Sequence, residues 1–345
     1  MDTPRTTTTP ATSSTTPTTT TLTTMRAIVQ DGYGGPEVLR PAHVPRPPVG
    51  DHDVLVRVAA AGVDRGTEHT LTGKPYAMRL GFGLRKPKNP VPGREVAGTV
   101  AAVGSAVTRF AVGDEVYGIA PGAFAEYAVA RDDKVAPKPV NLSFAQAATV
   151  PVSGGTALRA LVDVGKVQSG QSVLVVGASG GVGTFAVQLA KAFGAEVTGV
   201  CSTAKIDLVT SLGADRVVDH TREDFADGVH RYDLVLDVGG NTPVRRLRRA
   251  LKPRGTVVFV GGEGGGNVTG MSRQLGGVVT SPFLRQRLAL LVPKEHADVY
   301  ERLTGLIESG TVVPSVDRSY PLDEAADAMR LLQTGTVRGK VALTV

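Results

Sequence analysis

The sequence has only one cysteine, Cys201, in its 345 residues. A single cysteine excludes a disulfide framework and any zinc site built from several cysteine ligands. No apolar run approaches the roughly 20 residues of a membrane span, so no membrane partner is expected. The lack of disulfides fits a cytoplasmic location.

The sequence also lacks a recognised nucleic-acid-binding motif, although its formal net charge is +6. Its lysines and arginines are scattered, apart from short clusters at 85–88 and 245–249. The second cluster falls in a helix-like segment, where a solvated helix face accounts for it. A basic surface also attracts an anionic cofactor. We therefore expect no nucleic-acid partner.

Residues 1–24 are mostly threonine with a few prolines. Such a stretch has nothing to bury, so the sequence predicts a disordered tail. It lacks both the apolar core of a signal peptide and the arginines of a mitochondrial leader. The ordered pattern begins at Met25, and the sequence does not decide whether translation starts there or at Met1.

Two kinds of pattern follow the tail, and together they predict an α/β protein. Residues 25–145 form short strands separated by Gly and Pro turns, which predicts a mostly β domain. Its clearest strands are Val54–Ala60, Glu95–Val103 and Glu115–Ile119. From 146 to 280, apolar strands alternate with helical segments, which is typical of a doubly wound parallel sheet with helices on both faces.

Residues 281–345 return to a mixed character and are expected to complete the first domain. The predicted elements are a helix at Ala297–Glu308, a strand at Val312–Val313, a helix at Leu322–Gln333 and a closing strand at Lys340–Val345. Two domains leave a cleft between them, and we expect the ligand there.

A glycine-rich turn marks the start of the second domain. An apolar strand, Val173–Val176, runs into Ala178, Ser179, Gly180, Gly181, Val182 and Gly183, and a helical pattern and a second strand, Glu196–Val200, follow. A turn of this kind brings a phosphate against backbone N–H groups at the positive end of a helix. The A-x-G-x-x-G motif in this context predicts a dinucleotide site, with Gly180, Gly181 and Val182 around the pyrophosphate. The alternative is a tight turn that binds nothing.

Several motifs, in a fixed order, point to a known family. They are VPGREVAGTVAAVG (91–104), GDEVYG (113–118), GAFAEYAVA (122–130), AATVPVSGGTAL (147–158), GASGGVG (177–183), SLGADRVVDH (211–220), YDLVLDVGG (232–240), LKPRGTVVFVGG (251–262) and GKVALTV (339–345). From Met25 to Val345 the chain resembles the medium-chain dehydrogenase/reductase superfamily, in its zinc-independent, quinone-oxidoreductase-like branch. The resemblance implies a GroES-like domain, a Rossmann domain and a nicotinamide cofactor in the cleft.

The positions of the zinc ligands in zinc-dependent relatives argue against a metal here. Asp64 stands in place of the first cysteine, Arg94 in place of the histidine of a G-H-E motif, and the Ser153 region in place of the third ligand. A site built from Asp64 and His69 would supply two ligands, whereas a catalytic zinc needs three and a water. We therefore predict no metal.

The end of the second strand favours NADPH over NADH. An NAD enzyme places a carboxylate about 20 residues after the glycine turn, and none stands at 201–205. Ser202, Thr203 and Lys205 suit a 2′-phosphate instead; the alternative for Lys205 is a solvated lysine at a helix start. Relatives often carry Tyr at His220 and Arg at Ala204, both near the 2′-phosphate. By resemblance His220 contacts the same phosphate, and the alternative is a histidine in a surface loop.

The resemblance also assigns residues around the nicotinamide. It places Thr156 near the ring or its ribose, and Gly239, Val260, Gly261 and Gly262 along its far side. The alternative for the glycines is turn geometry alone.

The sequence determines less clearly which residue donates a hydrogen bond or proton to the substrate. Tyr76 and His69 are the candidate hydrogen-bond or proton donors, and Asp64 is the candidate that orients them. The alternatives are a pocket-wall role for Tyr76 and simple packing for His69. Residues 76–89 are rich in glycine and are either a lid over the substrate or a passive surface loop.

Together these features predict an NADPH-dependent oxidoreductase that passes hydride to a quinone, an enone or a related carbonyl compound. The alternatives are a metal-free NAD(P)-dependent alcohol dehydrogenase and a non-catalytic, NADPH-binding regulatory protein. The physiological substrate and the direction of the reaction do not follow from the sequence. A homodimer is expected if the apolar stretch at 281–293 forms an interface, although that stretch also suits internal packing.

Overall fold

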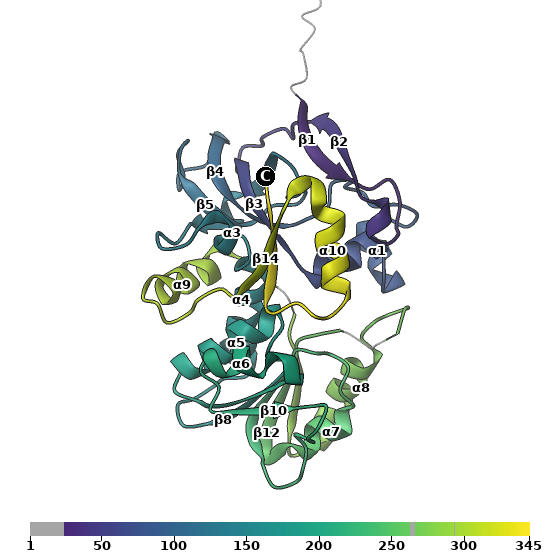
Figure 1. Ribbon diagram of the computed structural model, residues 1–345, viewed down its shortest axis with the longest axis vertical. Helices are drawn as coiled ribbons and strands as arrows, with labels where there is room; N and C mark the ends of the chain where they lie inside the picture. The colour runs from purple at the N-terminus through teal and green to yellow at the C-terminus, as the bar shows by residue number, and fades with distance from the viewer. Residues whose placement is uncertain (1–23, 263–265, 293) are drawn as a thin grey trace, which may run out of the picture.

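The computed structural model describes residues 24–262, 266–292 and 294–345. It has two lobes, one above the other along the long axis of the molecule (Figure 1). The lower lobe contains the middle of the sequence, and the upper lobe contains both ends of the described chain. The predicted tail lies outside the described residues, apart from Thr24, which begins the first strand.

The lower lobe is built on a six-stranded parallel sheet with the order β10-β9-β8-β11-β12-β13. Its strands are β8 (Ser172–Val176), β9 (Glu196–Cys201), β10 (Arg216–Asp219), β11 (Tyr232–Asp237), β12 (Leu251–Phe259) and β13 (Arg287–Leu290). The connecting helices are α5 (Gly181–Ala192), α6 (Ile206–Ser211), α7 (Val244–Arg249) and α8 (Ser272–Thr280).

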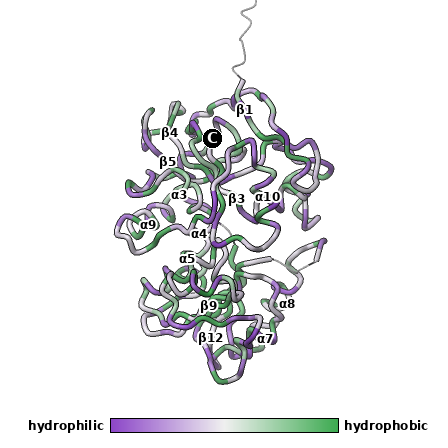
Figure 2. Tube along the Cα trace, viewed as in Figure 1, coloured by the Kyte–Doolittle hydropathy of each residue, from purple (hydrophilic) through white to green (hydrophobic). Residues whose placement is uncertain are grey.

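Alternate residues of the central strands belong to different cores. Val173 and Val175 pack with Phe185 of α5, whereas Leu174 and Val176 pack with Leu247 of α7. Because side chains alternate across a strand, the sheet buries both of its faces under helices. The hydrophobic colouring concentrates along these strands (Figure 2). The predicted doubly wound domain is confirmed.

The upper lobe is mostly β. A two-stranded sheet pairs β1 (Thr24–Val29) with β2 (Arg40–Pro45), and a larger sheet has the order β14-β15-β3-β4-β5-β7, with β6 beside β3. The larger sheet contains β3 (Asp53–Val63), β4 (Glu95–Val103), β5 (Glu115–Ile119), β6 (Tyr127–Arg131), β7 (Val135–Pro137), β14 (Val316–Pro321) and β15 (Lys340–Thr344). Since β15 pairs with β3, the end of the chain completes the first domain.

The remaining helices pack around and between the lobes. They are α1 (Arg65–Thr72), α2 (Arg79–Phe82), α3 (Phe144–Ala147), α4 (Pro151–Arg159), α9 (Ala297–Glu308) and α10 (Ala325–Gln333). A π-helical turn at Ala160–Val164 extends α4. Short 3₁₀ turns lie at Pro36–Val38, Tyr76–Met78, Asp132–Lys134, Thr203–Lys205, Ser281–Phe283 and Leu322–Glu324.

Two expectations from the sequence differ from the structure. The strand at Val312–Val313 is wrong: Val312 is buried, but its backbone N–H donates to Leu306 O at 3.1 Å, so it closes the turn after α9 and pairs with no strand. Strand β13 follows residue 280, where the sequence analysis ended the dinucleotide domain, yet it pairs with β12. The parallel sheet therefore continues to Leu290.

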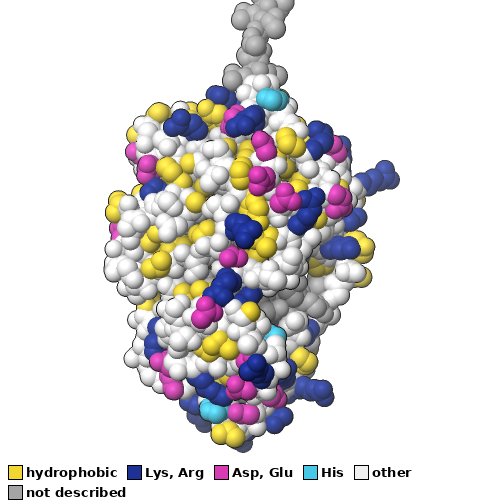
Figure 3. Space-filling model, in the orientation of Figure 1, with side chains coloured by type: hydrophobic (Ala, Val, Ile, Leu, Met, Phe, Trp, Pro, Cys, Tyr) yellow, Lys and Arg dark blue, Asp and Glu magenta, His cyan; other side chains and the backbone are white. Residues whose placement is uncertain are grey.

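Charges of both signs intermingle on the face of the molecule shown in Figure 3. Among the described residues, no helix is long and apolar enough to span a bilayer.

Candidate functional site

The predicted cofactor residues gather at one edge of the parallel sheet. The glycine turn follows β8, Ser202 follows β9, His220 follows β10, Gly239 follows β11 and Val260 follows β12. In a doubly wound sheet the ligand crevice lies at the carboxyl ends of the strands, where the strand order reverses. That reversal lies between β8 and β11, since β9 and β10 continue on one side and β12 and β13 on the other.

The glycine turn is shaped by close backbone contacts. Gly177 has φ +90°, and a Cβ on it would lie 3.0 Å from the backbone nitrogen of Gly239. A Cβ on Gly183 would overlap the carbonyl oxygen of Gly177 and lie 2.7 Å from the carbonyl carbon of Ala178. These positions need glycine because α5 packs directly against the turn.

The same turn fits the pyrophosphate of a dinucleotide. Helix α5 begins at Gly181, so its first N–H groups have no carbonyl partner within the helix. A Cβ on Gly180 would have only the oxygen of Gly177 near it, at 3.6 Å, so there is room beside this residue. Room, free donors and the positive end of a helix are the features that favour an anion.

The substrate domain is attached to this turn. Gly339 N donates to Ser179 O at 2.9 Å, which joins the start of β15 to the glycine turn. Lys340 Nζ then donates to Glu95 Oε2 at 2.5 Å, and both side chains are fully buried. Glu95 Oε1 accepts from Val152 N at 2.9 Å, at the start of α4. Sequence spacing gave no sign of this pair, although the GKVALTV motif contains Lys340.

Two cationic side chains, Lys205 and Arg338, lie beside the end of β9. Lys205 Nζ donates to Gly335 O at 2.8 Å and to Val337 O at 2.7 Å, so the lysine is not simply solvated. Its burial lowers the pKa of the ammonium. Arg338 Nη1 donates to Ala204 O at 2.6 Å, while Nη2 binds Asp207 at the same distance. The sequence analysis did not include Arg338.

The other polar residues predicted here differ in their surroundings. Ser202 is half-buried and its hydroxyl makes no hydrogen bond among the described residues, whereas the Thr203 hydroxyl donates to Asp219 at 2.5 Å. Hydrogen bonds from Thr203 and Thr221 lower the pKa of Asp219 to about 2. His220 is exposed, and its backbone N–H donates to Cys201 O at 3.0 Å. Thr203 is therefore engaged in hydrogen bonds, while the Ser202 hydroxyl is free among the described residues and His220 is exposed.

The loops after β11 and β12 are held together by α8. Backbone N–H groups of Val260 and Gly261 donate to Asp237 O at 3.1 and 3.0 Å. Arg273 Nη2 binds the fully buried Asp237 carboxylate at 2.7 Å, and Gln274 donates to Gly261 O at 2.9 Å. Burial raises the pKa of Asp237, and Arg273 opposes that effect. The sequence analysis missed both side chains of α8.

Thr156 lies in the middle of α4 and is half-buried. Gly262 is exposed and ends the described part of its loop. Among the described residues, neither Thr156 nor Gly262 makes a hydrogen bond to the glycine turn. Both lie on elements that border the cleft, α4 and the segment after β12.

The three predicted catalytic residues are near one another in sequence but make no mutual hydrogen bond among the described residues. Asp64 is buried and caps α1, accepting from Thr67 N at 2.6 Å. His69 Nδ1 lies 3.0 Å from Lys74 O. Tyr76 is 46 % exposed, and the guanidinium of Arg79 lies 4.9 Å from its ring centre. Asp64 therefore has a structural task that its position before a helix could have revealed.

Backbone contacts across the cleft fix the segment around Tyr76. Tyr76 N donates to Asn267 O at 2.7 Å, and Ala77 N donates to Val268 O at 2.9 Å. The segment predicted as a lid thus contacts the dinucleotide domain in this structure.

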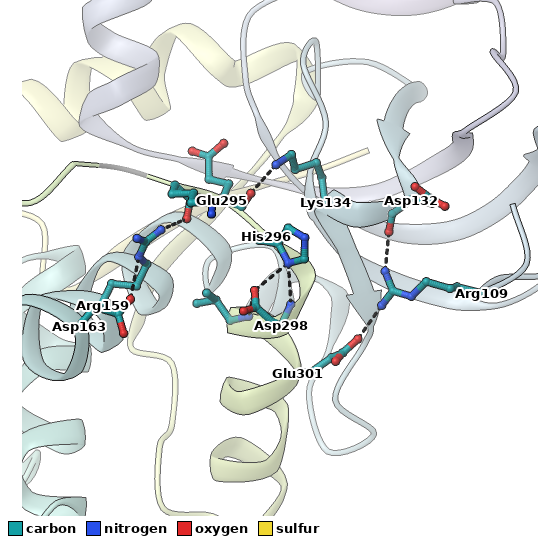
Figure 4. Close-up of polar contacts among 11 residues, drawn as sticks. Arg109, Asp132, Lys134, Arg159, Asp163, Glu295, His296, Asp298 and Glu301 are labelled. Carbon is teal, nitrogen blue, oxygen red and sulfur yellow. Dashed lines mark hydrogen bonds and ion pairs between the residues drawn. The ribbon is translucent and has the colours of Figure 1, made fainter. Parts of the chain in front are cut away.

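A second connection between the lobes follows β13 (Figure 4). Arg159 binds the carbonyl of Lys294, and Lys134 Nζ donates to the carbonyl of Glu295 at 2.5 Å. The carboxylate of Glu295 accepts from Arg94. Arg94, Lys134 and Arg159 therefore all bind the segment after β13, which leads the chain back into the substrate domain.

The residues present do not fit a catalytic zinc. Arg94, at the position of the histidine ligand, carries a guanidinium that cannot ligate a cation. Glu95 is paired with Lys340, and Asp64 caps a helix. Among the described residues, no group of three or more His, Cys, Asp or Glu side chains is placed to hold a metal.

Comparison with known proteins agrees with this architecture. Residues 50–140 match the alcohol dehydrogenase GroES-like domain family, and residues 212–343 match the zinc-binding dehydrogenase family. The chain is 35% identical over 334 residues to the chloroplastic NADPH-dependent alkenal/one oxidoreductase of Arabidopsis thaliana, covering 92% of this chain and 79% of that protein. It is 32% identical over 331 residues to the quinone oxidoreductase of Homo sapiens, covering 92% and 97%.

A solved structure gives the same result. The Escherichia coli quinone oxidoreductase complexed with NADPH has a TM-score of 0.79 and 27% identity, covering 93% of this chain and 100% of that one. Fold and site thus define a two-domain, dinucleotide-binding oxidoreductase. The chain belongs to the medium-chain dehydrogenase/reductase superfamily.

Proposed function

We propose that this protein is an NADPH-dependent reductase of quinones, enones or related carbonyl compounds. The observation that carries the proposal is the open glycine turn at the start of α5, which lies at the reversal point of the sheet. The relatives named for alkenal/one and quinone reduction support the substrate class.

Bound NADPH would supply the hydride. The N–H groups of Gly181 and Val182 would hold its pyrophosphate, and Ser202, Lys205 and Arg338 would surround its 2′-phosphate. Thr156, Gly239 and the Val260–Gly262 segment would border the nicotinamide. Arg273 and Gln274 act by fixing the last two loops in place.

The selectivity for NADPH is expected to depend on Lys205. Replacing it by methionine removes a charge-assisted contact, which should weaken NADPH binding about 10- to 100-fold. NADH binding should stay within about twofold, since NADH carries no 2′-phosphate. Titration by cofactor fluorescence measures both. Lys191→Met, at an exposed pair with Asp215, is the matched control; an equal loss for both cofactors in Lys205→Met would contradict the assignment.

We propose that side chains of this protein deliver the proton. We keep Tyr76 and His69 as the proposed donors and Asp64 as the residue that positions the helix carrying His69. The half-exposed Tyr76 ring beside Arg79 supports access to solvent. Unchanged turnover in both Tyr76→Phe and His69→Ala would remove these donors from the reaction.

We further propose that the reaction proceeds without zinc. The guanidinium of Arg94 at the ligand position and the pairing of Glu95 support this. Oxidation of NADPH by 1,4-benzoquinone and by a simple enone tests the function, and the same assay after dialysis against a chelator tests the metal. A rate that falls on chelation and returns with zinc would contradict the metal-free reaction.

We propose a homodimer formed through the dinucleotide domain. Phe283 is 87% exposed and Val279 is 71% exposed on the adjoining end of α8. Strand β13 beside them lies at an edge of its sheet. Light scattering of the purified chain should give twice the mass of one chain; the mass of a single chain would contradict the dimer.

A cytoplasmic location is proposed as well. The single buried cysteine fits a reducing compartment. The Arabidopsis thaliana relative, by contrast, is described as chloroplastic. Fractionation of cells that express the native gene tests the location, and recovery with a membrane or an exported fraction would contradict it.

A further inference from the structure

Arg94 lies at the start of β4 with its backbone fixed on both sides. Ala120 N donates to its carbonyl at 2.8 Å. The preceding Gly93 has φ +84°, and a Cβ there would collide with the ring of Phe124. A fixed backbone gives the guanidinium a restricted range of positions.

The guanidinium lies between Glu295 and the first turn of α1. Its Nη2 donates to the Glu295 carboxylate, and its Nη1 lies 3.6 Å from the position of a Cβ on Gly66, in the first turn of α1. The side chain is 34% exposed. Within the described ranges, Nε and Nη1 make no hydrogen bond, so donors remain for a ligand.

One buried polar atom near Arg94 also lacks a partner among the described residues, Asp64 Oδ2. Asp64 and Arg94 meet at Gly66, where a Cβ would lie 3.3 Å from Asp64 Oδ1 and 3.6 Å from Arg94 Nη1. Buried polar atoms without hydrogen bonds are rare in folded proteins. An unpartnered oxygen beside a cation with free N–H groups indicates a site for a polar ligand group.

This group of residues lies on the cofactor side of its domain. Glu95, next to Arg94, binds Val152 N at the start of α4. The Ser153 hydroxyl of the same turn lies 2.9 Å from a Cβ position on Gly181, in the glycine turn. Glu295 follows β13, and Leu291 N in that segment donates to Phe259 O at 3.1 Å, just before Val260. Arg94 is therefore flanked by elements that border the proposed nicotinamide position.

The ion pair with Glu295 is not needed to hold the segment after β13. Arg159 already binds the Lys294 carbonyl and Lys134 binds the Glu295 carbonyl, from two different elements (Figure 4). A purely structural role for Arg94 would duplicate these contacts. The pair instead keeps the guanidinium aimed at the space beside Gly66.

We propose that Arg94 is a catalytic residue that binds the substrate carbonyl oxygen and stabilises the negative charge that develops on it. The proposal rests on the function proposed above. The β-carbon of an enone gains the hydride supplied by NADPH, which is oxidised to NADP⁺. The alkene electron pair moves to the bond between the α-carbon and the carbonyl carbon, and the carbonyl pair moves to oxygen. The Arg94 N–H groups hold this enolate oxygen until one of the donors proposed above, Tyr76 or His69, delivers a proton to the α-carbon.

The first test compares turnover in variants. Arg94→Met should lower kcat about 100-fold, the usual loss for one oxyanion donor, and Arg94→Lys should recover part of it. The dissociation constant of NADPH should stay within about twofold, because Arg94 does not hold the cofactor. Arg109→Met is the matched control, since Arg109 pairs with Glu301 on α9 away from the cleft. Wild-type kcat in Arg94→Met would overturn the proposal.

The second test does not depend on turnover. 4-Nitrophenol, added to the cofactor-free protein, imitates the enolate when ionised, and its absorbance reports its pKa. Wild-type protein should lower the pKa of the bound phenol, and Arg94→Met should not, whereas Arg109→Met should behave as wild type. An equal shift in wild type and Arg94→Met would overturn the assignment. If wild type oxidises no NADPH with any quinone or enone, the proposed function fails, and phenolate binding still decides whether Arg94 is an anion-binding group.

Discussion

Gly183→Ala should lose NADPH binding. The new methyl group would overlap the Gly177 carbonyl oxygen and approach the Ala178 backbone at 2.7 Å, so α5 must move away from the turn. Movement of the helix displaces the N–H groups that bind the pyrophosphate. Loss of two charge-assisted hydrogen bonds corresponds to about 100-fold weaker binding or more. A fluorescence titration with NADPH measures it.

Two other glycines provide the controls for this variant. Gly305→Ala, on α9, meets no atom within 4 Å and should bind NADPH as wild type does. Gly180→Ala meets only the Gly177 oxygen, at 3.6 Å, so it should keep the thermal midpoint of wild type yet bind NADPH more weakly. Wild-type affinity in Gly183→Ala would show that the turn is not the pyrophosphate site.

Lys340→Met should produce the largest loss of stability. It leaves the fully buried Glu95 carboxylate without its ion-pair partner. Breaking a buried pair from one side costs about 3–5 kcal/mol in the free energy of unfolding. Urea unfolding followed by circular dichroism measures it. Lys252→Met, at a more exposed pair with Asp233, should cost no more than about 1 kcal/mol.

The loss in Lys340→Met should depend on pH. Burial raises the pKa of Glu95 even in the intact pair, and Lys340 opposes that effect. Without Lys340 the folded-state pKa rises further above the unfolded value of about 4.3. The folded variant then binds a proton that the unfolded chain releases, so its stability falls as pH rises through that range. The difference from wild type should shrink in acid, and a pH-independent difference would contradict the buried charge.

Local sequence patterns predicted the strands, helix and glycine turn that position the site. The bounds of β4, β5 and α9 follow from local periodicity and turns, and the glycine turn from its own spacing. Strand β13 did not emerge, because four residues in an apolar stretch do not show which strand they will join. The predicted strand at Val312–Val313 was wrong because two valines after a helix look the same in the sequence whether they form a strand or a turn. Only Val312 is buried.

The polar contacts of the site are mostly long-range, and sequence patterns do not reveal them. Lys340 and Glu95 are 245 positions apart, and Arg94 and Glu295 are 201 apart. Only the tertiary fold brings such side chains together. Asp64 is the opposite case: a residue of N-cap type before a helical segment predicts a cap, and that local signal accounts for one of its oxygens.

The most direct test is a titration of the purified protein with NADPH and with NADH, followed by addition of 1,4-benzoquinone and a simple enone. We expect tighter binding of NADPH than of NADH, and oxidation of the bound NADPH by at least one of the two acceptors. Binding of neither cofactor would contradict the central claim that the glycine turn at Gly177–Gly183 holds a dinucleotide.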